Sequence, residues 1–191
     1  VTVSNPYQGV DFASNSSTGH RISYLGAAPL KTGISVANNS GDGWIENVMF
    51  NPHYWARSNG YPQAEIPNIT TIWEHQQANL EAFKIGSATH EHILGTFVFA
   101  ALKGMYLAPD DGNSTIDIHL HGTDAGSNAV YLDNSAGSKV NFINTQLVLL
   151  GSSQIVIFSI RVFPLLIFRG PLYVWNCCRL TVPSPLKFSV G

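Results

Sequence analysis

The chain has 191 residues, of which 45% are hydrophobic and only 12% are charged, with a formal net charge of -2. This length supports one packed core and is short for two domains. The low charge and the many Gly, Asn and Ser residues argue against a helical solvated protein or a disordered tail. The sequence contains no run of Lys and Arg, so we do not expect nucleic-acid binding.

The first segment, "VTVSNPYQGVDF", already alternates between apolar and polar residues as a strand does. Because it begins at Val1 without a signal-like pattern, we expect the chain to be a piece of a longer protein. Cys177 and Cys178 are adjacent, so they predict neither a disulfide framework nor a metal site.

A short repeat then recurs along the chain, in which a small residue precedes an apolar-x-apolar pattern. Its copies are "GVDF" at 9, "GISV" at 33, "AFKI" at 82, "GMYL" at 104 and "AVYL" at 129. Most steps are roughly 22 to 25 residues, and the step from 33 to 82 is about double, so it holds one repeat plus an insertion. Alternating second strands lie between the copies, at 44–50, 93–99, 116–121 and 140–149.

Short strands between Gly/Asn/Ser/Asp turns cannot bury their apolar faces alone, so successive repeats must stack. We predict an all-β chain that forms a right-handed parallel β-helix, a solenoid, over residues 1–150. The competing fold is an antiparallel sandwich. Parallel pairing of "GVDF" on "GISV" favours the first, and antiparallel pairing of "GISV" with 44–50 would favour the second. Within the strands we expect Ile45 and Val48 to face the core.

Three stretches carry a family resemblance: "GWIENVMFNPHYW", "AFKIGSATHEHILGTFVFAALKGMYL" and "HGTDAGSNAVYLDNSAGSKVNFINTQLVL". They resemble consecutive rungs of pectate-lyase-like β-helix proteins, over roughly residues 1 to 150. The resemblance lies in the rhythm of the rungs rather than in a catalytic motif. It implies secretion and polysaccharide lyase or glycoside hydrolase activity, although viral tail-spikes and adhesins share the rhythm.

The insertion at about 51–79 combines aromatic, basic and acidic side chains, and insertions in solenoids commonly build the binding site. Aromatic faces stack on sugar rings and Arg binds uronate carboxylates, so we predict a glycan groove here. Its substrate-binding candidates are His53, Tyr54, Trp55, Arg57, Tyr61, Trp73 and His75. In the alternative interpretation, the rings only anchor a long loop to the solenoid. The stretch 72–83 can form about two helical turns, after which "LEAFKI" returns to the strand pattern.

Glycoside hydrolysis uses two carboxyl groups, and our catalytic candidates are Glu65, Glu74, Asp42 and Asp124. Asp42 and Asp124 lie in Gly-flanked turns, so turn capping is the alternative role. Glu65 and Glu74 lie in the insertion, where a surface salt bridge is the alternative. A lyase would instead use a base and a cation, for which His53 and Arg57 are available.

The stretches "HEH" at 90–92 and "IDIHLH" at 116–121 contain possible metal ligands. Alternation would place Asp117, His119 and His121 in one outward row, with Ile116, Ile118 and Leu120 facing the core. Outward histidines on such a wall usually meet water, so we predict no metal and no cofactor.

Residues 151–191 are strongly apolar and contain prolines at 164, 171, 183 and 185, which cannot donate to a sheet ladder. Arg161, Pro164 and Arg169 interrupt the segment, so we do not expect a membrane helix. The tail forms either degenerate final rungs or an atypical end, and we expect it to pack worse than residues 1–150.

We therefore expect part of a secreted, extracellular polysaccharide-degrading enzyme, a hydrolase rather than a lyase because no Lys/Arg-rich uronate patch is visible. Its partner is a polysaccharide or oligosaccharide, with no nucleic acid and no membrane, and an oligomer is possible. The alternative is a non-enzymatic β-helix shaft, as in an adhesin or tail-spike.

Overall fold

The computed structural model describes residues 1–58, 69–108, 114–133, 138–158, 165–169 and 173–175. At residues 57 and 58, and from residue 149 onward, the description covers the backbone alone. The chain is mostly β-strand with a large parallel sheet, so the all-β prediction is confirmed. Every strand pair among these residues is parallel, which excludes the antiparallel alternative for them.

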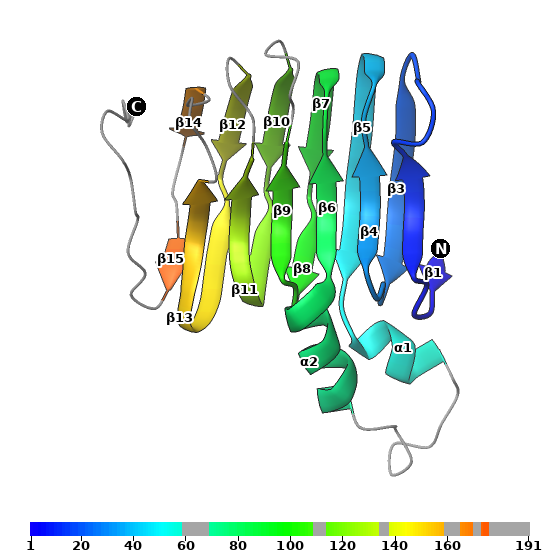
Figure 1. The fold of residues 1–191 in the computed structure, drawn as a ribbon, viewed down its shortest axis with the longest axis vertical. Helices are drawn as coiled ribbons and strands as arrows, with labels where there is room; N and C mark the ends of the chain where they lie inside the picture. Colours follow the sequence, from blue (N-terminus) through cyan, green and yellow to red (C-terminus); the bar gives the residue numbers. More distant parts are fainter. Residues whose placement is uncertain (59–68, 109–113, 134–137, 159–164, 170–172, 176–191) are drawn as a thin grey trace.

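The strands form three rows of parallel neighbours (Figure 1). The first row contains β2 (Gln8–Phe12), β4 (Thr32–Val36), β6 (Glu81–Ile85), β9 (Lys103–Leu107) and the second halves of β11 (Gly122–Leu132) and β13 (Gln146–Phe158). The second row contains β3 (His20–Ala27), β5 (Asn39–Phe50), β7 (Ala88–Leu94), β10 (Thr115–His119), β12 (Lys139–Ile143) and β14 (Leu165–Arg169).

The third row joins β1 (Thr2–Val3), β8 (Phe97–Phe99) and β15 (Tyr173–Trp175) with the last residues of β3 and β5 and the first halves of β11 and β13. Along the chain, the strands enter the first, second and third rows in that order and then begin again. Within each row, the backbone groups of a strand form hydrogen bonds with the neighbouring strands of the same row. The apolar side chains can therefore fill the space between the rows.

The register of the first row follows the sequence repeat. Gln8 pairs with Thr32, and Glu81 pairs with Lys103, so each residue lies beside its equivalent in the next repeat. The expected pairing of "GVDF" on "GISV" is therefore confirmed. Thr32 pairs with Glu81 across a much longer stretch of sequence, because two helices lie between β5 and β6.

These helices are α1 (His53–Ser58) and α2 (Ile69–Asn79), which lie together at one end of the strand rows (Figure 1). The sequence predicted a helix over 72–83; α2 begins before this stretch and ends before β6, where the strand pattern resumes as expected. The short helix α1 was not predicted. The Asn51 side-chain oxygen accepts a hydrogen bond from the His53 backbone N–H at 2.9 Å and caps its first turn.

The core lies between the rows and is built from aliphatic and aromatic residues. Ile45 and Val48 are 0% and 1% exposed, so their predicted inward orientation is confirmed. Leu120, also predicted to face inward, is 58% exposed, and the next residue, His121, is buried. The cause is the left-handed backbone of Leu120, at φ 53°, which shifts the inside-outside alternation of the chain at this point.

Leu120 belongs to a series of left-handed residues at the corner between the second and third rows. Its other members are Tyr24, Asn47, Gly95 and Asn144, each with a positive φ. The register places them side by side, since Glu46 pairs with Leu94, Leu94 with His119, and His119 with Ile143. Each passage of the chain turns at the same place, which keeps the strands on both sides of the corner in line.

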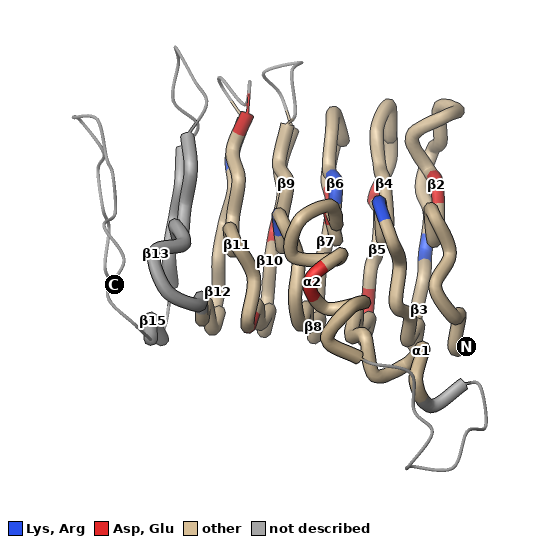
Figure 2. Tube along the Cα trace, turned by 60° about the horizontal axis from the view of Figure 1, so that its bottom comes forward, with Lys and Arg blue, Asp and Glu red and all other residues tan. Residues whose placement is uncertain are grey.

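Charged residues are few along the traced chain, and Lys or Arg often lies beside Asp or Glu (Figure 2). No helix among the described residues has the length and the apolar character that crossing a membrane requires. Part of the tail forms β13, β14 and β15, which pair in parallel. Its side chains, and hence its predicted poor packing, lie outside the described residues.

Candidate functional site

Four acidic and histidine side chains from three strands meet on the outer face of the second row. They are Asp42 on β5, His90 and His92 on β7, and Asp117 on β10, here called the His90 cluster. Asp42 pairs in register with His90, and His92 with Asp117. Because alternate residues of a strand share a face, His90 and His92 both point outward, while Glu91 between them points inward.

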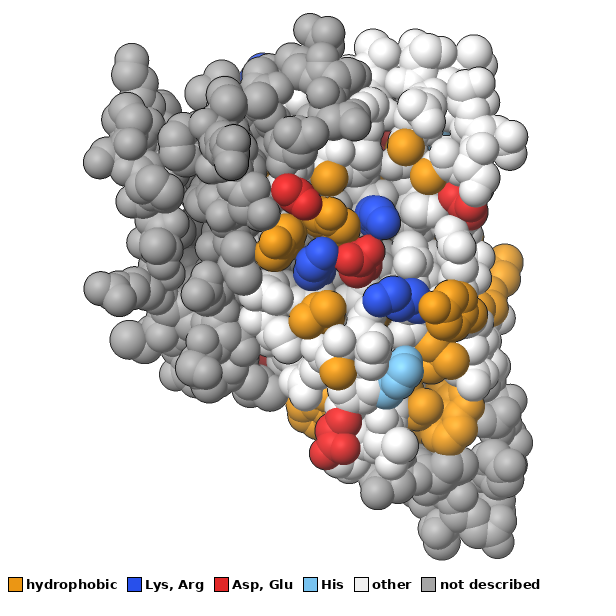
Figure 3. Space-filling view, viewed as in Figure 1, with side chains coloured by type: hydrophobic (Ala, Val, Ile, Leu, Met, Phe, Trp, Pro, Cys, Tyr) orange, Lys and Arg blue, Asp and Glu red, His pale blue; other side chains and the backbone are white. Residues whose placement is uncertain are grey.

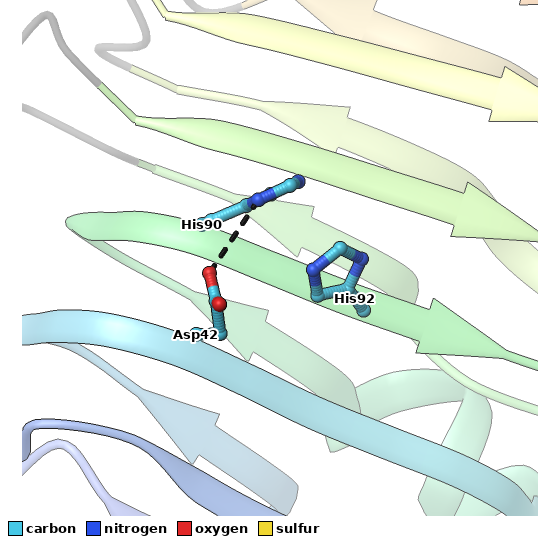
Figure 4. A group of neighbouring side chains, drawn as sticks. All are labelled: Asp42, His90 and His92. Atoms are coloured by element: carbon cyan, nitrogen blue, oxygen red, sulfur yellow. Dashed lines mark ion pairs between the residues drawn. The ribbon is translucent and has the colours of Figure 1, made fainter.

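His90 lies between two carboxylates (Figure 4 shows the Asp42 side). Its Nε2 is 2.9 Å from Asp117 Oδ2, and its Nδ1 is 3.6 Å from Asp42 Oδ1. The Asp42 side chain is 68% exposed, whereas that of Asp117 is 20% exposed. The imidazole is therefore held on its inner side by Asp117 and is open on the side of Asp42.

Asp117 is the fixed member of the cluster. Its second oxygen, Oδ1, accepts a hydrogen bond from the Asn141 amide on β12. Burial raises the pKa of Asp117, but the hydrogen bonds from Asn141 and His90 outweigh burial and lower this pKa below its usual value. Asp117 is thus a carboxylate at neutral pH, and a carboxylate only accepts hydrogen bonds.

His92 contacts two other rings, one stacked and one tilted. It stacks on Trp44 with ring centroids 3.9 Å apart and planes 15° apart, and its centroid is also 3.9 Å from that of His90. Burial, followed by the nearby His90, lowers the pKa of His92. His92 is consequently neutral at physiological pH and keeps a lone pair available on its ring.

The ligand atoms of Asp42, His90 and His92 all lie within 4.8 Å of one another, so these three residues could hold a metal ion. The possible ligands noted from the sequence were "HEH" at 90–92 and the row Asp117, His119 and His121, and the structure corrects that row. Asp117 and His119 do face outward, but His121 lies inside, 1% exposed, with its two ring nitrogens each 2.8 Å from a threonine hydroxyl.

The three predicted catalytic residues that the structure describes do not come together. Asp42 lies in the His90 cluster, near the first residue of β5. Glu74 is exposed on α2, which lies beyond the opposite end of that strand (Figure 1). Asp124 lies on β11 in the third row, where its backbone oxygen accepts a hydrogen bond from the Ala100 N–H. Glu65 lies outside the described residues.

Among the predicted substrate-binding residues, Tyr54 and Trp73 contact the strands. The Tyr54 hydroxyl donates to the Met49 sulfur at 3.4 Å. The Trp73 ring packs edge-on against Phe99, with centroids 4.9 Å apart. These contacts support the anchoring interpretation for both rings, and sugar contact by the insertion stays a prediction.

The remaining residues predicted for the groove take varied positions. His53 is exposed at the start of α1, and Trp55 is half-buried on the same helix. His75 is exposed on α2, with its Nε2 3.2 Å from the Leu30 carbonyl oxygen. The Arg57 side chain and Tyr61 lie outside the described residues.

A cavity of about 430 Å³ lies between α1 and the left-handed corner. Its lining includes Tyr24, Asn47, Met49, Tyr54 and Phe97, and Tyr24 is 72% exposed. A second hollow of about 260 Å³ shares Met49 and Tyr54 with it. The insertion and the corner thus enclose a groove with aromatic and amide side chains.

A second cluster of charged and aromatic residues lies on the outer face of the first row (Figure 3). Lys103 Nζ is 2.9 Å from Glu81 Oε1 and 3.6 Å from the centre of the Tyr106 ring. The Tyr106 hydroxyl in turn donates to Asp133 at 3.0 Å. The charges in this cluster are matched by partners within it, so it is better suited to stabilising the sheet than to binding a ligand.

Sequence reasoning missed the partnership between Asp42, His90 and Asp117, although it noticed each residue. The signal was the repeat itself: Asp117 lies one repeat after its partner His92, and Asn141 lies one repeat after Asp117. Aligning the repeats would have placed these outward residues in one row, whereas comparing neighbours within a single strand could not.

Comparison of this chain with protein families, with curated proteins and with solved structures finds no match, so the site is interpreted from its own geometry.

Proposed function

We propose that this chain is part of a right-handed parallel β-helix protein that binds and degrades a polysaccharide outside the cell. Three observations support this fold: the exclusively parallel pairing of the described strands, the stacking of equivalent repeat positions such as Gln8 on Thr32 and Glu81 on Lys103, and the cyclic order of the three rows. A solenoid of this kind offers long flat walls along which an extended polymer can lie.

The observation that carries the function is the position of the aromatic groove relative to the His90 cluster. The groove contains Asn47, and the cluster contains Asp42, which lies earlier on the same strand. Between them Glu46 accepts hydrogen bonds from Arg21 and Ser23 at 2.8 and 3.0 Å. A glycan that stacks on Tyr24 can therefore reach polar side chains and then the cluster along β5.

The cluster supplies the proton chemistry. His90 touches a fixed carboxylate, Asp117, and an exposed one, Asp42, so its ring is positioned to accept a proton from a bound hydroxyl or water. Asp42 keeps its role as an acid-base candidate, and Asp117 joins it as the positioning residue for His90. Hydrolysis remains our first proposal and elimination the second.

The test measures binding and turnover on the same panel of neutral and acidic polysaccharides. Reducing ends report hydrolysis, and ultraviolet absorbance of an unsaturated product reports elimination. We expect Tyr24→Ala to weaken glycan binding, and His90→Ala to abolish turnover while binding persists. Tyr7→Ala is the matched control, because Tyr7 is also 72% exposed and does not line the groove. Equal binding by the Tyr24 and Tyr7 variants would refute the groove.

A non-enzymatic β-helix, as in an adhesin or tail-spike shaft, is the second candidate. It is favoured by the lowered pKa values of the outward carboxyls Asp117 and Glu46, because a glycosidase acid usually needs a raised pKa. In that case the chain would bind a polysaccharide without releasing any product. Binding with no product on every member of the panel would decide for this candidate.

A further inference from the structure

The exposed half of the His90 cluster has the arrangement of a metal site. We propose that Asp42, His90 and His92 bind one divalent transition-metal ion, through one carboxylate oxygen and two imidazole nitrogens. This proposal goes beyond glycan binding and does not depend on it, and in the metal-bound form His90 and Asp42 act as ligands instead of as acid-base groups. No metal was predicted from the sequence: His90 and His92 were noted there as possible ligands, but they were not combined with Asp42 on the neighbouring strand β5.

The distances fit a small cation. Zinc binds imidazole nitrogen and carboxylate oxygen at about 2.0 to 2.2 Å, so two ligand atoms of a tetrahedral site are about 3.4 Å apart. His90 Nδ1 and Asp42 Oδ1 are 3.6 Å apart, and each of the three residues offers one ligand atom that lies within 4.8 Å of those of the other two. The Asp42 side chain is 68% exposed, so it has room to adjust its position around an ion.

The hydrogen bonds behind His90 prepare its Nδ1 for a metal. His90 Nε2 lies 2.9 Å from Asp117 Oδ2, and a carboxylate only accepts hydrogen bonds, so Nε2 carries the hydrogen that joins them. Nδ1, which is 3.6 Å from Asp42 Oδ1, then keeps its lone pair for a metal ion. The Asn141 amide fixes the other oxygen of Asp117, which completes the carboxylate-histidine-metal arrangement that orients ligands in many metalloproteins.

The ligand set also indicates the class of metal. Two imidazoles and one carboxylate suit zinc, copper, nickel or iron, whereas calcium and magnesium prefer sites made of oxygen alone. Three protein ligands leave a fourth position on the exposed side, where a water molecule or a ligand hydroxyl can bind. The stacking of His92 on Trp44 holds the second imidazole in place without using its nitrogens.

The experiment titrates Zn²⁺ into the metal-stripped full chain by calorimetry at neutral pH, and repeats the titration with Co²⁺ while recording its visible absorption. We expect one ion per chain and an intense tetrahedral cobalt spectrum. Asp42→Ala and His92→Ala should remove this binding. Asp117→Asn, which changes only the residue behind His90, should weaken it by about 10- to 100-fold.

His75→Ala is the matched control, because His75 is an exposed histidine on α2, away from the cluster. It should bind Zn²⁺ as the unaltered chain does. Asp42 is so exposed that its replacement leaves the core intact, and circular dichroism checks this for every variant. If Asp42→Ala binds Zn²⁺ as tightly as the unaltered chain, or if the chain binds none, the proposal is wrong.

Discussion

The buried histidine at the corner predicts a specific loss of stability in acid. His121 is 1% exposed, and its Nδ1 and Nε2 lie 2.8 Å from the hydroxyls of Thr96 and Thr123. Burial lowers the pKa of His121 from 6.5 to about 3. Between these values the unfolded chain binds a proton on His121 and the folded chain does not, so acid favours unfolding.

The size of the effect follows from the two pKa values. Above pH 6.5 His121 is neutral in both states, and the free energy of unfolding does not depend on it. As the pH falls below 6.5, the stability decreases by about 1.4 kcal/mol for each pH unit, until the folded pKa is reached. At pH 5 the loss is roughly 2 kcal/mol relative to pH 7.5, a large part of the stability of a small domain.

The assay is urea unfolding at pH 7.5 and pH 5 for the unaltered chain and for His121→Gln, which can bond the threonines but cannot titrate. We expect the variant to be less stable at pH 7.5 because of altered packing, yet to lose roughly 2 kcal/mol less on acidification. His75→Gln, an exposed replacement, should behave as the unaltered chain. The same pH dependence in His121→Gln and the unaltered chain would refute this account of the corner.

Further predictions concern packing and a tyrosine. Gly33→Ala should destabilise the chain by about 1 to 3 kcal/mol, because the new Cβ would clash with the Ala82 backbone oxygen and lie 2.5 Å from Phe50 Cε2. At Gly86 the nearest atom would be 3.1 Å away, so alanine should cost less there, and equal urea midpoints for the two variants would contradict this. Phe50→Ala, at a fully buried position, should cost about 3 to 5 kcal/mol in the same assay. Burial and then the hydrogen bond to Asp133 raise the pKa of Tyr106 to about 12, so Asp133→Asn should lower this pKa. Ultraviolet titration of the tyrosinate measures the change, and an unchanged pKa would count against that hydrogen bond.

The rhythm of the fold could be predicted from the sequence because it is local. Small residues before apolar-x-apolar patterns recur at the repeat length, and strand alternation correctly places Ile45, Ile116 and Ile118 inside. Alternation failed at Leu120 because nothing in a leucine indicates a left-handed backbone, whereas Asn47 at the equivalent position is a residue that tolerates one. Helix α1 was missed because so short a helix carries too little periodicity to detect.

The candidate site was harder to predict, since it depends on contacts between repeats. Asp42 and His90 are far apart in the sequence, and they become neighbours only because the helical insertion leaves the strand register intact. The aromatic, basic and acidic residues of the insertion instead led to the prediction of a glycan groove there. The aromatic residues of the insertion contact the strands, as Trp73 does with Phe99. Amino-acid composition alone therefore cannot separate an aromatic ring that anchors a loop from one that binds a sugar.

The left-handed corner has a consequence for how this sequence can change by insertion and deletion. In a regular strand, Ile45 and Val48 would face opposite sides because they are three positions apart, yet both face inward. The left-handed corner between them therefore resets the inside-outside alternation once in every repeat. Losing one residue within a strand would turn its remaining side chains inside out up to the next corner. Gaining or losing a whole repeat would leave each corner above another corner. Sequences of this kind can therefore lengthen or shorten by unit duplication far more readily than by single-residue changes.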